Sequence, residues 1–266
     1  KIATGAKSRL FGSFVGGLGI VTVSFILSFY AIVSGWMLAF LLQPVAQLIG
    51  LTALADWLIV DGVVRNSLFV VVFMLLTVFI ISAGVKEGIE KWATRLMPSL
   101  VLILVLLIVY VFTLPGAMEG LRAYLVPDFS VFARPGLLVS AMGQAFFSLS
   151  LGVGTMLVYG SYISKSENLP VIGSLVALLD VGIAVLAGLL ILPAMYVALA
   201  SGVEIFDVQG GLIAGPGLII SVLPALFDSM GAVGGFVAFA FFALMAIASL
   251  TSSISINAEP NKRHKL

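Results

Sequence analysis

Long hydrophobic segments dominate the pattern of this chain. Six of them carry almost no charge: Phe14–Leu42, Asn66–Ala83, Leu96–Leu114, Leu137–Ile163, Leu169–Ala200 and Met230–Ile256. A helix needs about 20 apolar residues to cross a bilayer, and backbone groups in lipid must be hydrogen-bonded internally. Because these segments show no strand-like alternation, the pattern predicts six transmembrane helices.

A seventh apolar stretch, Gly217–Phe227, is too short to cross a bilayer. It is bounded by Gly215-Pro216 on one side and by Asp228 on the other. We therefore expect a surface helix or a re-entrant helix there.

Composition agrees with a membrane protein and argues against several other classes. Of 266 residues, 61% are hydrophobic and 9% are charged, whereas a soluble domain averages roughly 25% charged residues. The net charge of +1 gives no reason to expect nucleic acid as a partner. Cysteine is absent and His264 is the single histidine, so thiol or histidine chemistry is not expected. The serines and aspartate within the spans lack a base partner, and we predict no enzyme activity.

The distribution of lysine and arginine predicts an orientation. With the amino-terminal end in the cytoplasm, ten of these residues fall on the cytoplasmic side and only Arg65, Arg122 and Arg134 fall outside. An excess of positive charge marks the cytoplasmic side of membrane proteins. We expect a multi-pass protein with a cytoplasmic amino-terminal end, and we expect the charges outside the spans in solvated loops.

The fourth segment is interrupted near its middle by polar residues and by Gly152 and Gly154. A glycine inside a helix costs about 1 kcal/mol relative to alanine. Broken helices build substrate and ion sites in secondary transporters. Small residues also serve close helix packing in membranes, so the residues alone leave both interpretations open.

Two further features are candidates for ion chemistry. Thr251 and Ser252 lie in a run of hydroxyl residues near the end of the last segment, and hydroxyl oxygens suit small hard cations. Taken alone, hydrogen bonds from these hydroxyls to their own helix are the favoured explanation. Asp180 is the charged residue inside the predicted spans, where a carboxylate costs about 2.5–3.5 kcal/mol.

Five stretches in order carry a family resemblance. They are Tyr30 six residues before Trp36, the loop Gly84–Lys91 followed by Met97-Pro98, the segment Gln144–Gly154, the loop Gly215–Leu218, and Leu250–Ile254. From about residue 5 to residue 256 the chain resembles the neurotransmitter:sodium symporter family, in particular its bacterial amino-acid members. The resemblance implies an all-α membrane protein, a partial LeuT-type bundle covering the third to eighth helices, one of them broken.

The resemblance also implies roles for particular residues. Tyr30 would bind the substrate carboxylate, and Phe147 would close over the substrate. Five residues would line the side-chain pocket: Ile26, Ser150, Val153, Ser253 and Ile256. Ser148 and Asp180 would hold a first sodium ion. The carbonyl of Ala248 and the hydroxyls of Thr251 and Ser252 would hold a second.

The sequence departs from the family pattern at three places. Asp180 stands where asparagine is common, and an ionised carboxylate there would lessen any need for chloride, which we leave open as a counter-ion. Val153 is small for its position and would enlarge the pocket. Residues 1–256 are expected to form an incomplete transporter bundle, and residues 257–266 a polar tail unlike the family.

The function expected from these features is sodium-coupled symport of a small zwitterionic amino acid by alternating access, in a cell membrane such as a bacterial inner membrane. Two alternatives are kept. One is a related cation-coupled carrier of a solute that is not an amino acid. The other is a transport-incompetent fragment or membrane scaffold.

Overall fold

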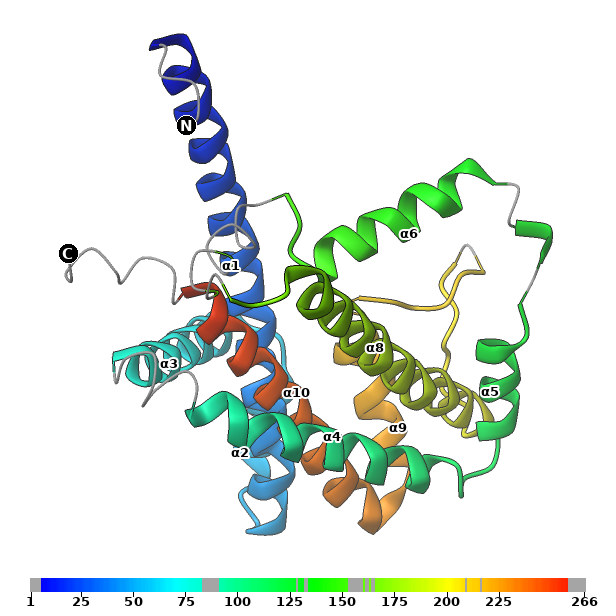
Figure 1. The fold of residues 1–266 in the computed structure, drawn as a ribbon. Coiled ribbons are helices and arrows are strands. Elements are labelled where there is room, and N and C mark those ends of the chain that lie inside the picture. The colour runs from blue at the N-terminus through cyan, green and yellow to red at the C-terminus, as the bar shows by residue number, and fades with distance from the viewer. Residues whose placement is uncertain are drawn as a thin grey trace. The chain divides into compact units, whose positions relative to one another are not determined.

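The computed structural model describes residues 6–82, 91–127, 129–131, 134–152, 160, 163, 166–208, 210–215 and 217–257. Helices make up most of this part of the chain (Figure 1). Within it, the pairing of extended backbone is confined to one isolated bridge, between Phe206 and Leu212. The predicted all-α class is therefore confirmed.

In the described part of the chain, five helices are long and apolar enough to cross a membrane. They are α1 (Ala6–Leu48), α3 (Val63–Ser82), α4 (Lys91–Val111), α8 (Leu169–Ala200) and α10 (Gly234–Asn257). They correspond to five of the six predicted segments, and α8 has the predicted bounds. The remaining bounds differ by a few residues because helix ends depend on local turns and not on hydrophobicity alone.

The remaining predicted segment, Leu137–Ile163, is not one continuous helix. Helix α6 (Pro135–Ser148) ends after 14 residues. Ser150 then has a φ of 53° and Gly152 a φ of 87°, which lie in the left-handed region that a right-handed helix cannot contain. Residues 153–159 lie outside the described part of the chain. The predicted break in the helix is confirmed, at the polar and glycine-containing stretch that indicated it.

Several short helices were not predicted from the sequence. They are α2 (Thr52–Ile59), α5 (Ala117–Leu125) and the 3₁₀ helices η2 (Phe129–Val131) and η4 (Gly231–Val233). The stretch Gly217–Phe227 forms the π-helix η3 (Leu218–Val222) and the start of α9 (Leu223–Ser229). Val222, Leu223 and Leu226 are each 1% exposed, so this stretch packs into the protein core and is not a surface helix.

The contacts within the chain divide it into two compact units. The first contains residues 1–29, 128–182 and 259–266, and we call it the α6 unit. The second contains residues 30–127 and 183–258, and we call it the core unit. The boundaries fall inside α1 and α8, and each unit is described by itself below.

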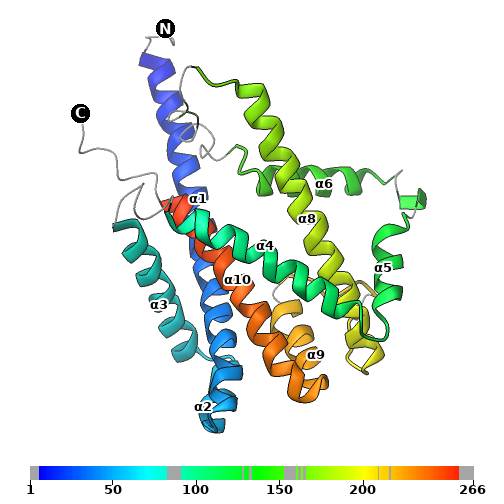
Figure 2. The same ribbon diagram turned by 60° about the horizontal axis from the view of Figure 1, so that its bottom comes forward.

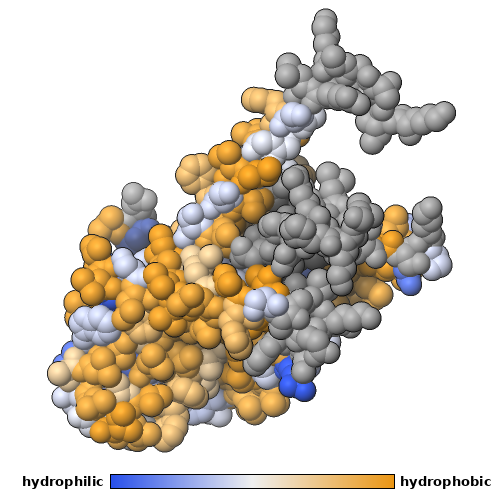
Figure 3. Space-filling model, turned by 90° about the vertical axis from the view of Figure 1, so that its left-hand side faces the viewer, coloured by the Kyte–Doolittle hydropathy of each residue, from blue (hydrophilic) through white to orange (hydrophobic). Residues whose placement is uncertain are grey.

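Helix α10 is the centre of the core unit. It packs against α3, α4 and α9, and Figure 2 shows α3 on one side of α10 and α9 on the other. Near its start, Phe242 lies 5.2 Å from Phe40 and 5.5 Å from Phe241 between ring centroids. These aromatic pairs add about 0.5–1.5 kcal/mol each beyond the burial of their surface. The outer surface of the protein is also largely hydrophobic, as expected for helices that face lipid (Figure 3).

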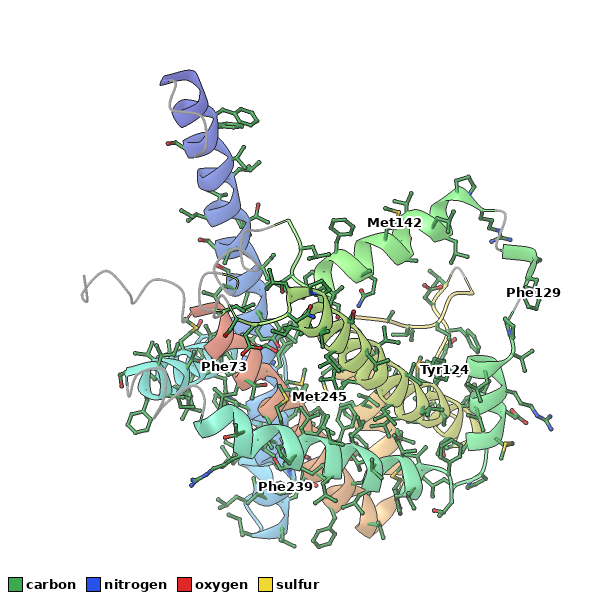
Figure 4. The ribbon with its side chains drawn as sticks, in the orientation of Figure 1. Phe73, Tyr124, Phe129, Met142, Phe239 and Met245 are labelled. Carbon is green, nitrogen blue, oxygen red and sulfur yellow. The ribbon has the colours of Figure 1, made fainter. Side chains whose placement is uncertain are left out.

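Helix α5 packs closely on the second half of α8. Tyr124 of α5 lies between the two helices (Figure 4), and its hydroxyl donates to the carbonyl of Val185 at 3.4 Å. A side chain at Gly188 would collide with the Tyr124 ring, and one at Gly120 would come within 2.5 Å of Pro193. Small residues therefore let α5 approach the backbone of α8.

Arg65 is buried, which corrects the expectation that it lies in a solvated loop. Its side chain is 3% exposed. The guanidinium donates to the carbonyl of Leu58 at 2.9 Å and to Asn66 Oδ1 at 2.6 Å, and it lies 5.6 Å from the centre of the Phe40 ring. Its Nη2 is 3.5 Å from the carboxylate of Asp61. These partners offset the cost of burying the charge, and they join the ends of α1, α2 and α3.

Replacement of Arg65 tests this junction. Arg65→Ala removes the donors to Leu58, Asp61 and Asn66, and we expect a loss of about 2–3 kcal/mol of stability. The melting temperature in detergent should fall by roughly 5–10 °C. Arg122→Ala, at an exposed position on α5, is the matched control and should melt like the wild type. Equal melting temperatures for all three proteins would contradict a structural role for Arg65.

Candidate ion and substrate site

The α6 unit brings together Ser148 and Asp180, the two residues expected at the first sodium site. Ser148 Oγ donates to Asp180 Oδ1 at 2.6 Å. This length is typical of a hydrogen bond from a hydroxyl to an ionised carboxylate, which is about 2.5–2.7 Å. Because the two residues are 32 positions apart, the contact joins α6 to α8.

The position of Asp180 matters because of its depth in α8. With a rise of about 1.5 Å per residue, it lies about 16 Å from the start of the helix at Leu169. Because the 32-residue α8 is longer than a hydrocarbon core of about 30 Å, Asp180 lies within the apolar part of the helix and away from both of its ends. A half-buried carboxylate at that depth needs a hydrogen-bond donor or a cation, and Ser148 provides one donor.

The end of α6 places additional polar groups beside Ser148. Ser148 is the last residue of the helix, and the amides of Leu149 and Ser150 bond back to the carbonyls of Ala145 and Phe147. The amide of Leu151 bonds to the carbonyl of Phe146, so the carbonyls of Ala145, Phe146 and Phe147 all accept hydrogen bonds from the turn. Carbonyl oxygens at the end of a broken helix are suitable ligands for an alkali cation.

Three other predicted residues lie in the same unit. Ile26 of α1 is half-buried, Phe147 is 60% exposed, and Ser150 is half-buried in the turn after α6. Val153 lies outside the described residues. The pocket roles of these residues stay predictions.

In the core unit, two of the oxygens expected at the second sodium site are neighbours. Thr251 Oγ1 lies 2.9 Å from the carbonyl oxygen of Ala248 and 3.1 Å from that of Ile247. Thr251 therefore makes the bonds to its own helix that were the alternative explanation of this motif. Its single hydrogen serves one carbonyl at a time. Two oxygens 2.9 Å apart can both lie about 2.4 Å from one cation.

Tyr30 and Ser252 also meet in the core unit. Tyr30 is half-buried on α1, and its hydroxyl interacts with the side chain of Ser252 on α10. Ser252 itself is exposed. The contact brings together a residue expected to bind the substrate and a residue expected to bind sodium.

Ser253 is fully buried and faces α3. Its exposed fraction is 0%, and its Oγ lies 3.4 Å from Thr77 Oγ1. The side chain of Ile256 lies outside the described residues, although its backbone belongs to α10. The pocket roles of Ser253 and Ile256 stay predictions.

Sequence reasoning missed Thr77. It is 0% exposed and belongs to a buried stripe on α3 that also contains Arg65, Phe69, Phe73 and Ile80. The spacing of three or four residues is that of one helix face. A threonine in phase with the aromatic residues of a membrane span was a signal that could have identified it.

Comparison with known proteins connects these residues to a family. The Sodium:neurotransmitter symporter family matches residues 50–259. The uncharacterized sodium-dependent transporter YhdH of Bacillus subtilis (strain 168) is 34% identical over 264 residues, which cover 94% of this chain and 56% of that protein. A creatine transporter of Bos taurus, described as sodium- and chloride-dependent, is 32% identical over 175 residues, or 65% of this chain and 27% of that protein.

A solved structure supports the same assignment. The crystal structure of MhsT in complex with L-phenylalanine is similar with a TM-score of 0.74 and 36% sequence identity, and the match covers 93% of this chain and 55% of that chain. This chain thus spans about half the length of the first relatives it matches. With several membrane-spanning helices and this similarity over most of its length, the chain is a multi-pass membrane protein that belongs to the sodium:neurotransmitter symporter family.

Proposed function

We propose that this chain is the part of a sodium-coupled amino-acid symporter that carries both sodium sites and one side of the substrate pocket. The observation that carries the proposal is the 2.6 Å bond between Ser148 at the end of α6 and Asp180 in the middle of α8. A carboxylate inside a membrane span costs free energy, and such residues mark functional sites. In a family of sodium symporters, a sodium ion is the cation that fits this need.

Asp180 and Ser148 are the proposed ligands of the first sodium ion. A bound Na⁺ would balance the negative charge of the carboxylate, which Ser148 alone stabilises only in part. The carboxylate would also provide a negative charge that an asparagine at this position would not. We propose that transport by this protein does not require chloride, although a relative is described as chloride-dependent.

Ala248, Thr251 and Ser252 are the proposed ligands of the second sodium ion. The 2.9 Å distance between Thr251 Oγ1 and the Ala248 carbonyl supports this, because the two oxygens can share one cation. The Thr251 hydroxyl would face the ion with its oxygen while its hydrogen stays on the carbonyl of Ile247.

The proposed substrate is a small zwitterionic amino acid. Tyr30 would donate to its carboxylate after release from Ser252, whose hydroxyl would then be free to face the second sodium ion. One hydroxyl pair would thereby link substrate binding to ion binding, as reciprocal coupling requires. The bound L-phenylalanine of the similar MhsT structure supports an amino acid over other solutes.

The proposed mechanism is alternating access. Substrate and sodium would bind from one side of the membrane, and the protein would then expose them to the other side. We propose the cell membrane as the location, a bacterial inner membrane in particular, with the amino-terminal end of this chain in the cytoplasm, as the ten-to-three distribution of lysine and arginine indicates.

Uptake by the whole transporter that contains this chain tests the proposed function. The protein is reconstituted in liposomes with an inward Na⁺ gradient and offered radiolabelled amino acids, creatine and dopamine separately. We expect one or more amino acids to accumulate above their external concentration, and no accumulation when K⁺ replaces Na⁺. Accumulation of creatine or dopamine alone would contradict the amino-acid assignment, and equal uptake in K⁺ would contradict sodium coupling.

Substitution of Asp180 tests the first sodium site. Asp180→Asn keeps an oxygen and loses the charge, so the Na⁺ concentration for half-maximal substrate binding should rise about tenfold. Asp180→Ala removes the oxygen as well and should have the larger effect. In Asp180→Asn, replacement of chloride by gluconate should weaken binding further, whereas the wild type should not respond.

Glu119→Gln is the matched control, since it removes one carboxylate from the first turn of α5 outside the membrane-spanning helices. It should bind Na⁺ like the wild type. If both Asp180 variants bind Na⁺ and substrate like the wild type, with and without chloride, Asp180 is a structural acid.

A further inference from the structure

Thr77 on α3 makes a buried contact whose role the proposed sites leave unexplained. Its Oγ1 donates to the carbonyl of Phe73 at 3.0 Å, and the same oxygen lies 3.4 Å from Ser253 Oγ. The two hydroxyls share this contact, and either of them can be the donor. Both side chains are 0% exposed, so water does not compete for this bond.

Ser253 lies behind the proposed second sodium site. Successive residues of an α-helix are about 100° apart, so Ser253 is roughly 200° from Thr251 around α10. Ala248, Thr251 and Ser252 are spaced three and four residues apart and share one face. The bond from Ser253 to α3 therefore holds α10 from the side opposite to Thr251.

Near the carboxyl-terminal end of α10, a bond such as that between Ser253 and Thr77 is needed to fix the rotation of the helix about its axis. Near its start, large rings such as Phe241 and Phe242 interlock with Phe227 and set the orientation of the helix. Between Ala246 and Ser253 the buried residues are small: Ser249, Thr251 and Ser253. Lipid does not orient a helix that is apolar on all sides, so polar contacts between helices fix the rotation there.

A modest rotation would be enough to disturb ion binding. A side-chain oxygen roughly 4 Å from the helix axis moves by about 1 Å when the helix turns by about 15°. Binding sites must be held within about 0.5 Å and 10–20° of the productive geometry. Ser249 and Thr251 also bond back to carbonyls of α10, and those bonds do not define its rotation.

From this geometry we propose that Thr77 is a positioning residue for the second sodium site: through Ser253 it fixes the rotation of α10 and with it the ligands Ala248, Thr251 and Ser252. The inference rests on the proposed function, since it concerns the same sodium site. Thr77 does not touch the ion. Replacement of Thr77 should therefore lower the affinity for Na⁺. The affinity for the substrate, measured at saturating Na⁺, should change less.

Thr77→Val and Thr77→Ser separate positioning from packing. Valine keeps the shape and removes the hydroxyl, whereas serine keeps the hydroxyl. In the whole transporter, the half-saturating Na⁺ concentration for binding of radioactive sodium should rise about 3- to 20-fold in Thr77→Val, the range expected for one hydrogen bond between membrane helices. Thr77→Ser should return close to the wild-type value. Thr251→Val, which removes a proposed ligand, should shift the titration in the same direction and further.

Thr22→Val is the matched control. Thr22 also donates to the carbonyl four residues back in its helix, at 2.9 Å to Leu18, and it lies in α1. It should titrate like the wild type. Ser253→Ala removes the other half of the contact, and the double variant with Thr77→Val should be no weaker than the single variants.

Several results would overturn the inference. One is a Thr77→Val titration that coincides with the wild type. Another is a lower melting temperature with an unchanged Na⁺ titration, which would make Thr77 a packing residue only. If Thr77→Val does not fold, Ser253→Ala takes its place: a Na⁺ titration of Ser253→Ala that coincides with that of the wild type would overturn the inference. A wild-type protein that binds no sodium in a saturable manner would contradict the proposed function itself, before any variant is compared.

Discussion

Polar groups inside lipid have few partners, and this constraint decides most of what is informative in the chain. A carboxylate or hydroxyl that water would solvate at a surface must find a donor, an acceptor or an ion at bilayer depth. Asp180 finds Ser148 at 2.6 Å, and Tyr30 finds Ser252. Thr77 meets Ser253 at 3.4 Å. These contacts hold the helices in place, and the first two pair residues that are proposed to bind ions or substrate.

The same constraint explains the interruption of α6. The helix ends at Ser148, and the left-handed φ values of Ser150 and Gly152 prevent it from continuing. The amides of Leu149, Ser150 and Leu151 bond back to carbonyls at the end of α6, so the turn itself satisfies part of the backbone that the break exposes. Burial of Arg65 follows the same rule, because four partners surround its guanidinium.

The sequence predicted the spans well because hydrophobic length is a direct physical requirement of the bilayer. It also located the break in α6, since Gly152 and the polar residues before it weaken a helix locally. It did not predict α2, α5 or the burial of Arg65. Those features depend on contacts between segments far apart in the chain, such as Tyr124 with Val185 and Arg65 with Phe40, and hydrophobicity does not reveal such contacts. The site residues came from family resemblance, and the structure adds Thr77, whose contact with Ser253 spans 176 positions.

The central claim is that the polar groups at bilayer depth form two sodium sites. Equilibrium dialysis of the whole transporter against radioactive sodium, at constant ionic strength with K⁺ as the balancing ion, measures the number of ions bound at saturation. The account predicts about two Na⁺ per protein, neither displaced by K⁺ at equal concentration. Saturation at zero, or binding that K⁺ displaces equally well, would contradict it.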